Sequence, residues 1–103
     1  MSFRVVLATA PRAKADALAK GLVAARLAAC ASVLPGAVSH YRWEGKVRRD
    51  AECLLVIKTR AALFKKLESW VRRHHPYAVP EVLALPVAGG SKPYLAWLAE
   101  STR

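Results

Sequence analysis

Two imidazoles, a phenol and a carboxylate occur close together in this sequence, at His74, His75, Tyr77 and Glu81. Imidazole nitrogen favours copper, zinc and nickel, and a carboxylate oxygen can join it, so His74, His75 and Glu81 are candidate ligands of a divalent cation. Adjacent histidines at a helix end point in different directions. One chain therefore supplies one or two good ligands, and water or a neighbouring subunit has to complete the site. The alternative interpretation is a proline-rich structural turn in which these side chains only fill space.

The two cysteines, Cys30 and Cys53, have the spacing neither of a redox CxxC pair nor of a zinc site. If the chain forms a hairpin turn at Glu44-Gly45, Cys30 lies opposite Thr59, far along the strand from Cys53. Strands rise by about 3.3 Å per residue, so the two sulfurs are beyond disulfide reach. We therefore expect two free thiols in apolar strands, where a thiol is usually buried and inert.

Two further side chains of this hairpin can take part in chemistry. His40 is a candidate ligand, although on a strand with two apolar faces it is more typical of a packing or interface residue. Glu52 falls opposite Ala37 and is interpreted as a surface or interface carboxylate. Aromatic residues could also line a pocket, but their spacing is more typical of a core or an interface: Tyr41, Trp43, Tyr77, Tyr94 and Trp97.

No catalytic constellation is readable in the chain, because no nucleophile has a recognisable base partner, and we expect a protein that is not an enzyme. The segment Gly89-Gly90-Ser91 lacks the remaining residues of a phosphate-binding loop. The net charge of +10 comes largely from scattered Lys and Arg residues, without a nucleic-acid recognition motif. Solubility and nonspecific attraction of anions account for that charge, so no specific nucleic acid is expected as a partner.

The composition predicts one domain, formed by residues 1–103. No apolar run approaches the ~20 residues needed to span a bilayer, so no membrane association is expected. The segment after Met1 lacks the pattern of a signal peptide, which favours a cytoplasmic protein. Asn and Gln are absent and Met1 is the only methionine, a composition typical of heat-adapted proteins, although a GC-rich genome explains the abundant arginine equally well.

The elements that must position these residues follow from periodicity and from proline. Pro11 favours the first turn of a helix, and Pro35-Gly36 interrupts a strand, where a bulge would shift the register by one residue. The turn at Glu44-Gly45 joins two strands into a long hairpin. The predicted elements of this half are a strand over residues 3–9, a helix over 11–28, a strand over 28–43 and a strand over 47–59.

The second half is predicted to contain a helix, a strand over residues 82–87 and a short closing helix. Thr59 or a near neighbour caps the helix that follows the strand over residues 47–59. This helix ends near His74, because Pro76 disfavours helical geometry in the residue before it. Ser91 caps the closing helix. The apolar face of the helix that ends near His74 carries Leu63, Phe64, Leu67, Trp70 and Val71. The inner face of the closing helix carries Tyr94, Leu95, Trp97 and Leu98.

This β-α-β-β-α-β order plus a C-terminal helix matches the split βαβ, ferredoxin-like plan, so the expected fold class is α+β. In that plan both main helices pack on one face of a four-stranded antiparallel sheet. Several strands are apolar at successive positions, as in Val5-Val6-Leu7, so both faces are expected to be buried. The closing helix is too short to cover the second face, and other copies of the same chain are the simplest cover.

The combination of these segments resembles the CutA family of divalent-cation tolerance proteins. Order and spacing agree over nearly the whole chain. The matching pieces are Ala8-Thr9-Ala10-Pro11, Leu22 to Cys30, Pro35-Gly36, Tyr41-Arg42-Trp43-Glu44-Gly45-Lys46, Glu52, Lys58-Thr59, His75 to Glu81 and Tyr94-Leu95-Ala96-Trp97. The resemblance implies a ferredoxin-like subunit, a tight cytoplasmic homotrimer similar in architecture to the PII signalling proteins, and an association with copper and other divalent metals.

The metal ligands that the resemblance implies include a histidine at the position of His74 or His75. In some members a cysteine at the end of the first strand is a further ligand. This chain has Ala8 there. The soft thiolate best suited to Cu(I) is therefore missing, and we expect weak to moderate binding of Cu(II) or another divalent cation, with none tightly bound.

Two functions remain open at the level of the sequence. The first is a trimeric divalent-metal (copper) binding protein of divalent-cation tolerance. The second is a PII-like regulatory module that binds a small molecule in the clefts between subunits, where Arg26, Lys58, Tyr77 and Glu81 would be the polar groups. In both, the partners are copies of the same chain and an unknown protein or small ligand.

Overall fold

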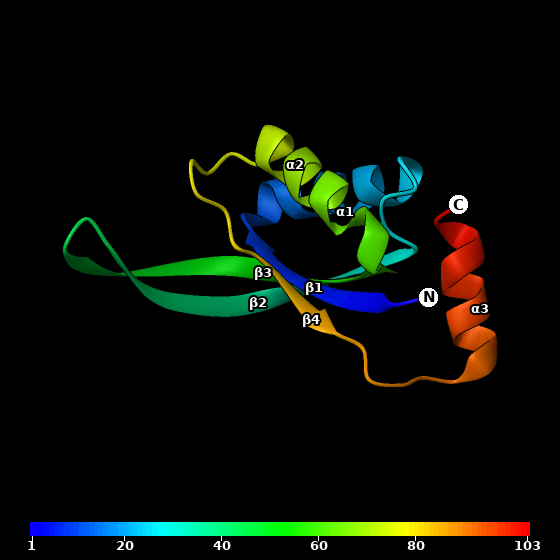
Figure 1. The fold of residues 1–103 in the computed structure, drawn as a ribbon. Coiled ribbons are helices and arrows are strands. Elements are labelled where there is room, and N and C mark those ends of the chain that lie inside the picture. The colour runs from blue at the N-terminus through cyan, green and yellow to red at the C-terminus, as the bar shows by residue number, and fades with distance from the viewer.

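Four antiparallel strands form one sheet, and two helices cover one of its faces (Figure 1). The strand order is β2-β3-β1-β4, which is that of the split βαβ plan. The expected α+β, ferredoxin-like fold is therefore confirmed. The computed structural model describes residues 1–103, in the order β1 (Phe3–Ala10), α1 (Arg12–Ala24), β2 (Cys30–Trp43), β3 (Lys46–Arg60), a 3₁₀ turn (Ala61–Leu63), α2 (Phe64–His74), β4 (Val82–Pro86) and α3 (Lys92–Ser101).

The core lies between the sheet and the helices α1 and α2. Alternate residues of the central strands point toward the helices and are buried, among them Val6, Leu55 and Ile57. Leu22 of α1 and Leu67 of α2 belong to the same cluster and have no exposed surface. Full burial of such a side chain contributes about 1.5–3 kcal/mol. This apolar layer therefore holds both helices on one face of the sheet.

Helix α1 ends at Ala24, earlier than the alanine-rich sequence predicts. The backbone N–H groups of Leu27 and Ala28 both donate to the carbonyl oxygen of Leu22, at 3.0 and 3.3 Å. Arg26 takes a left-handed conformation with a φ of 58°. A left-handed residue ends a helix and lets the amides that follow cap its last carbonyl groups. Arg26 thus lies exposed in a turn that leads to β2.

The hairpin of β2 and β3 extends well beyond the rest of the sheet (Figure 1). Near its tip the register is as predicted, with Ala37 opposite Glu52. The register shifts between Leu34 and Ala37, at the expected bulge. Because of this shift Cys30 lies opposite Lys58, so the prediction that it faces Thr59 is wrong by one residue. Both cysteines are free thiols, as expected.

Thr59 does not cap the second helix, contrary to the prediction. β3 continues to Arg60, and a 3₁₀ turn precedes α2, which begins at Phe64. The side chain of Thr59 is fully buried, and its Oγ1 donates a hydrogen bond to the carbonyl oxygen of Leu27 at 2.7 Å. A buried hydroxyl requires such a partner, and this one ties β3 to the turn after α1. The far end of α2 lies at His74, as predicted.

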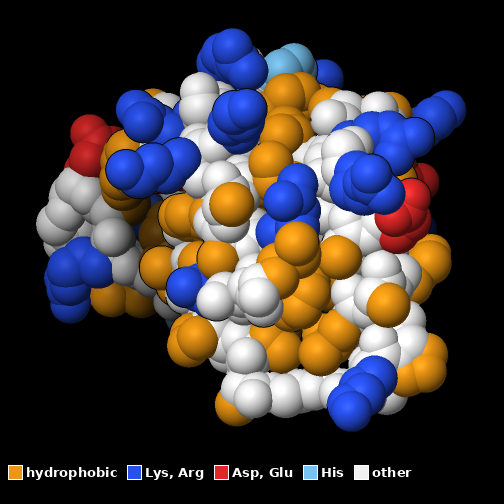
Figure 2. Space-filling model, turned by 45° about the vertical axis from the view of Figure 1, so that its right-hand side comes forward, with side chains coloured by type: hydrophobic (Ala, Val, Ile, Leu, Met, Phe, Trp, Pro, Cys, Tyr) orange, Lys and Arg blue, Asp and Glu red, His pale blue; other side chains and the backbone are white.

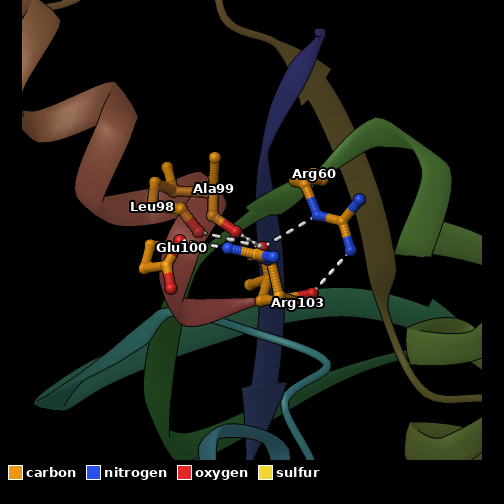
Figure 3. A network of polar contacts seen from close by, with 6 residues as sticks. Arg60, Leu98, Ala99, Glu100 and Arg103 are labelled. Carbon is orange, nitrogen blue, oxygen red and sulfur yellow. Dashed lines mark hydrogen bonds and ion pairs between the residues drawn. The ribbon is translucent and has the colours of Figure 1, made fainter.

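Helix α3 stands at the end of the sheet, where Arg60 of β3 holds its last turn (Figures 1 and 3). The guanidinium of Arg60 donates to Oγ1 and to the carbonyl oxygen of Thr102, at 2.9 and 2.5 Å. The hydroxyl of Thr102 shares its one proton between the carbonyl oxygens of Leu98 and Ala99. The Arg60 side chain therefore fixes the C-terminal end of the chain against the sheet.

The predicted inner face of α3 is only partly correct. Leu98 is buried, but Tyr94 and Trp97 keep 42% and 46% of their surface exposed, since the helix touches only the end of the sheet. Ser91 caps the helix as predicted, with its Oγ accepting a hydrogen bond from the N–H of Tyr94 at 3.4 Å. None of the three helices has the length and apolar composition needed to cross a membrane.

The second face of the sheet is largely uncovered. Leu34, Leu83 and Leu85 lie on it, with between 46% and 59% of their surfaces exposed. Figure 2 shows the contrast with the helical side: Lys and Arg side chains are most numerous in the upper half, over the helices, and hydrophobic side chains gather in the lower half. A single chain therefore leaves an apolar surface in contact with water.

Candidate cation site at the end of helix α2

His75 is buried in the connector between α2 and β4, with only 8% of its surface exposed. Its Nδ1 accepts a hydrogen bond from the backbone N–H of Tyr77 at 3.1 Å, which leaves the ring proton on Nε2. Nε2 then donates to the carbonyl oxygen of Thr9 at 2.8 Å. Both ring nitrogens are occupied, so His75 fixes the connector to the end of β1 and has no lone pair left for a metal.

His74, the last residue of α2, is exposed and makes a different set of contacts. Its Nδ1 lies 2.7 Å from the carbonyl oxygen of Trp70, which can only accept, so Nδ1 carries the ring proton. The imidazole also stacks on the indole of Trp70, with the ring centroids 4.0 Å apart. Nε2 of the neutral ring therefore has a free lone pair. Metal-binding histidines typically use one nitrogen for such a hydrogen bond and the other for the metal.

The predicted ligands do not form a closed metal site within one chain. His74 offers one nitrogen, His75 offers none, and Glu81 is an exposed carboxylate at the end of the connector. The structure contains no group of three or more His, Cys, Asp or Glu side chains that could hold a metal ion. Ala8 is buried beneath the helices and supplies no ligand. Within the chain only His74 offers a free imidazole nitrogen, so a divalent cation bound there would need further ligands to complete its coordination.

A cavity of about 820 Å³ lies between the hairpin and the connector. Its walls carry the aromatic rings of Tyr41, Trp43 and Tyr77 and the carboxylates of Glu52 and Glu81. Small-molecule sites in proteins typically have volumes of roughly 300–1,000 Å³. The structure thus brings Tyr77 and Glu81, two residues of the predicted small-molecule cleft, to one cavity.

The two basic residues of that predicted cleft lie elsewhere. Arg26 is in the turn after α1, and Lys58 is in β3 near the start of β2. Nζ of Lys58 lies 3.4 Å from Oγ of Ser32 and 3.7 Å from Sγ of Cys30. Neither Arg26 nor Lys58 lines the cavity. Within one chain, the four residues predicted to share a cleft are therefore divided between two regions.

Glu52 is a site residue that the sequence did not identify. The sequence favours a surface or interface position, but only 6% of this residue is exposed in the single chain. Its Oε2 accepts a hydrogen bond from the hydroxyl of Tyr77 at 3.0 Å. Burial, with this hydrogen bond, raises the pKa of Tyr77 from 10.0 to about 12. The one hint in the sequence is a carboxylate that directly precedes the apolar run beginning at Cys53.

Tyr41 makes a second contact between a phenol and a carboxylate, on the hairpin. Its hydroxyl donates a hydrogen bond to Asp50. This hydrogen bond is the main cause that raises the pKa of Tyr41 above its ordinary value. Both tyrosines therefore remain protonated donors at neutral pH and hold their carboxylates in fixed positions.

Comparison with known proteins assigns the chain to a family. The profile of the CutA1 divalent ion tolerance proteins matches residues 4–101. The CutA divalent-cation tolerance protein of Thermus thermophilus is 50% identical over 99 residues, which cover 95% of this chain and 96% of that protein. The chain spans about half of the chloroplastic CutA of Arabidopsis thaliana, with 51% identity over 100 residues, or 96% of this chain and 55% of that one.

Solved structures agree with this assignment. The crystal structure of CutA1 from Oryza sativa superposes with a TM-score of 0.97 at 47% identity, over 100% of this chain and 95% of that chain. The shared fold, together with the profile match over residues 4–101, places the chain in the class of divalent-cation tolerance proteins. The chain belongs to the CutA1 family.

Proposed function

We propose that this chain acts in divalent-cation tolerance as a homotrimer that binds a divalent cation, preferentially Cu(II), through His74. The observation that carries the proposal is the free Nε2 of His74. The other ring nitrogen is hydrogen-bonded to the carbonyl oxygen of Trp70, and the ring is stacked on the Trp70 indole. A ligand held in this way loses little freedom on coordination, which favours binding.

The rest of the coordination sphere is proposed to come from Glu81, water or a neighbouring subunit. Nitrogen ligands favour late transition metals, so Cu(II) should bind better than Mg(II) or Ca(II). No strong preference for Cu(I) is expected, because Ala8 supplies no thiolate. His75, predicted as a ligand from the sequence, is now proposed to support the site by fixing the connector.

The test is a calorimetric titration with Cu(II) of the wild type, His74→Ala and His75→Ala. His74→Ala should lose affinity by at least about tenfold, because it removes the donor atom itself. His75→Ala should lose less affinity than His74→Ala, because it removes no donor atom, but it should unfold more easily, since it breaks two partly buried hydrogen bonds. His40→Ala tests the other exposed histidine, which lines the cavity with Glu81, and it should keep the affinity if His74 is the imidazole ligand. Equal affinity in His74→Ala and the wild type would reject this site.

The pH dependence gives an independent check of the same proposal. A protonated imidazole has no lone pair to donate, so protons compete with the cation. The affinity for Cu(II) should therefore be lower at about pH 5 than at about pH 7.5. Equal affinities at the two pH values would mean that no histidine is a ligand.

The PII-like regulatory module remains the second candidate, and the cavity between the hairpin and the connector favours it. The volume of the cavity suits a small molecule, and Tyr77 and Glu81 line it. In this function Arg26 and Lys58 would have to reach the ligand from a neighbouring subunit. A cytoplasmic location and the absence of catalysis stay predictions of the sequence. Relatives of this family are described as chloroplastic and as periplasmic.

A further inference from the structure

The walls of the cavity between the hairpin and the connector carry aromatic rings and carboxylates, besides the imidazole of His40 and small or apolar side chains. Aromatic rings come from Tyr41 and Trp43 on the hairpin and from Tyr77 on the connector. Carboxylates come from Glu52 of β3 and Glu81 of the connector. Aromatic faces and carboxylates share one preference, since both attract positive charge.

The charge of the cavity is opposite to that of the whole chain. The chain has 17 Lys and Arg residues against 7 Asp and Glu, yet no Lys or Arg is among the lining residues. Two of the seven acidic residues line the cavity, and Asp50 lies beside it through its hydrogen bond with Tyr41. Arg48 lies directly opposite Tyr41 in the hairpin, but it is not a lining residue, and its guanidinium lies 4.0 Å from the carboxylate of Glu44. The cavity is therefore an acidic site on a basic protein.

Glu52 is the buried carboxylate in the wall of this cavity. It is 94% buried. Removing a carboxylate from water is unfavourable unless hydrogen-bond donors replace the lost water. Oε2 has such a donor in Tyr77, but Oε1 receives no hydrogen bond within the chain. Every fully buried side-chain nitrogen or oxygen in the chain has a hydrogen-bond partner. Because Oε1 has none, it is not fully buried, and it faces the cavity that Glu52 lines. Oε1 of Glu52 is thus held in a fixed orientation and can accept a hydrogen bond from a molecule in the cavity.

We propose that this cavity binds an organic ammonium ion, a primary amine carried on a short apolar body. The ammonium group would donate a charge-assisted hydrogen bond to Oε1 of Glu52, and the apolar body would lie against Tyr41 and Trp43. A metal ion suits the cavity less, because no three-ligand group exists there. An anion is disfavoured by both carboxylates. The site differs from the proposed cation site, because His74 does not line the cavity, although Glu81 lines it and is also a proposed further ligand of that cation.

The test uses n-butylammonium as the probe and 1-butanol, which lacks the charge, as its control. Calorimetry on the full-length protein should show saturable binding of n-butylammonium and none of 1-butanol. Glu52→Gln keeps an acceptor for Tyr77 but removes the charge, and should weaken binding by about tenfold or more. Glu100→Gln changes the net charge equally on the exposed end of α3 and should bind as the wild type does.

Tyr77→Phe provides a second variant in case Glu52→Gln alters the fold. It removes the hydroxyl that orients Glu52, so the affinity for n-butylammonium should fall while the protein stays folded by circular dichroism. Equal binding of 1-butanol, or unchanged affinity in both variants, would overturn the proposal. So would the absence of binding to the wild type, which is the result expected if a second copy of the chain fills the cavity.

Discussion

At the scale of single residues, His74 and His75 show that the hydrogen-bond partners of an imidazole determine which ring nitrogen carries its proton. Nδ1 of His75 accepts from a backbone N–H, and that of His74 lies against a carbonyl oxygen. The two rings therefore carry their protons on different nitrogens. Only His74 is left with an accessible lone pair, although the two side chains are chemically identical.

Raising the pH above 10 should destabilise the fold through Tyr77. A tyrosine in the unfolded chain ionises near the ordinary pKa of 10.0, whereas burial and the hydrogen bond to Glu52 raise the pKa of Tyr77 to about 12. The stabilising contribution of this phenol is therefore complete below pH 10 and is lost as the pH rises toward 12. Urea denaturation at a series of pH values should show the free energy of unfolding falling across this interval.

The control for this prediction is a pair of tyrosine variants. Tyr77→Phe cannot ionise, so its free energy of unfolding should fall less steeply across the interval than that of the wild type. Tyr94→Phe, on α3 and without a contact to Glu52, should follow the wild type. An identical slope for Tyr77→Phe and the wild type would show that folding does not raise the pKa of Tyr77.

At the scale of elements, the packing of α1 against α2 determines where the candidate cation site lies. Gly21 of α1 lets the indole of Trp70 come close, since a Cβ at position 21 would lie 2.6 Å from the ring. The same indole stacks on His74. The glycine on one helix therefore sets the position of the proposed metal ligand His74 at the end of the other.

Gly21→Ala should destabilise the protein even though alanine is the better helix former. Alanine gains about 1 kcal/mol of helix propensity over glycine, but overpacking costs about 1–3 kcal/mol. A net loss of up to about 2 kcal/mol is expected in chemical denaturation at fixed protein concentration, together with weaker Cu(II) binding as Trp70 moves. Gly89→Ala is the control, because its Cβ would meet nothing within 4 Å. A Gly21→Ala protein of wild-type stability would contradict the close contact.

At the scale of the whole molecule, one side of the sheet is covered by charged helices and the other is apolar and largely open. Leu83 and Leu85 of β4 lie on the open side, as does Leu34 of β2. Exposed patches of this kind mark interaction surfaces in soluble proteins. The apolar open face is the physical support for the proposal of a homotrimer.

Light scattering at low micromolar concentration should give three times the chain mass of 11.2 kDa. Leu83→Asp should shift the mass toward that of one chain, because it places a charge on the face that is proposed to be buried. Val23→Asp makes the same change on the helical side, where Val23 is also exposed, and should leave the mass unchanged. A folded wild-type monomer would reject the trimer.

Heat resistance is the second expectation at this scale. The chain lacks the thermolabile residues Asn and Gln, and assembly would bury the open face of each subunit. Calorimetric melting should therefore give a midpoint above about 90 °C. A midpoint in the ordinary mesophilic range would contradict this prediction.

The sequence by itself determined the order of the elements, the end of α2, the bulge in the hairpin and the family. These features depend on local signals: Pro76 ends α2, and Pro35-Gly36 interrupts β2 whatever the rest of the chain does. The alanine-rich end of α1 carries no such signal, so its boundary was predicted too late. The same holds for Thr59, whose hydroxyl found a partner in Leu27 instead of capping a helix.

Only the tertiary structure decided which predicted ligand is free, where Glu52 lies, and that Arg26 and Lys58 are far from Tyr77. These outcomes depend on partners distant in the sequence, as in the hydrogen bond from His75 to Thr9 or from Tyr77 to Glu52. Neighbouring residues encode backbone geometry, but the donors and acceptors that meet a side chain are set by how the elements pack. The sequence therefore located the candidate site on the connector, and packing decided which hydrogen-bond partners each of its side chains meets.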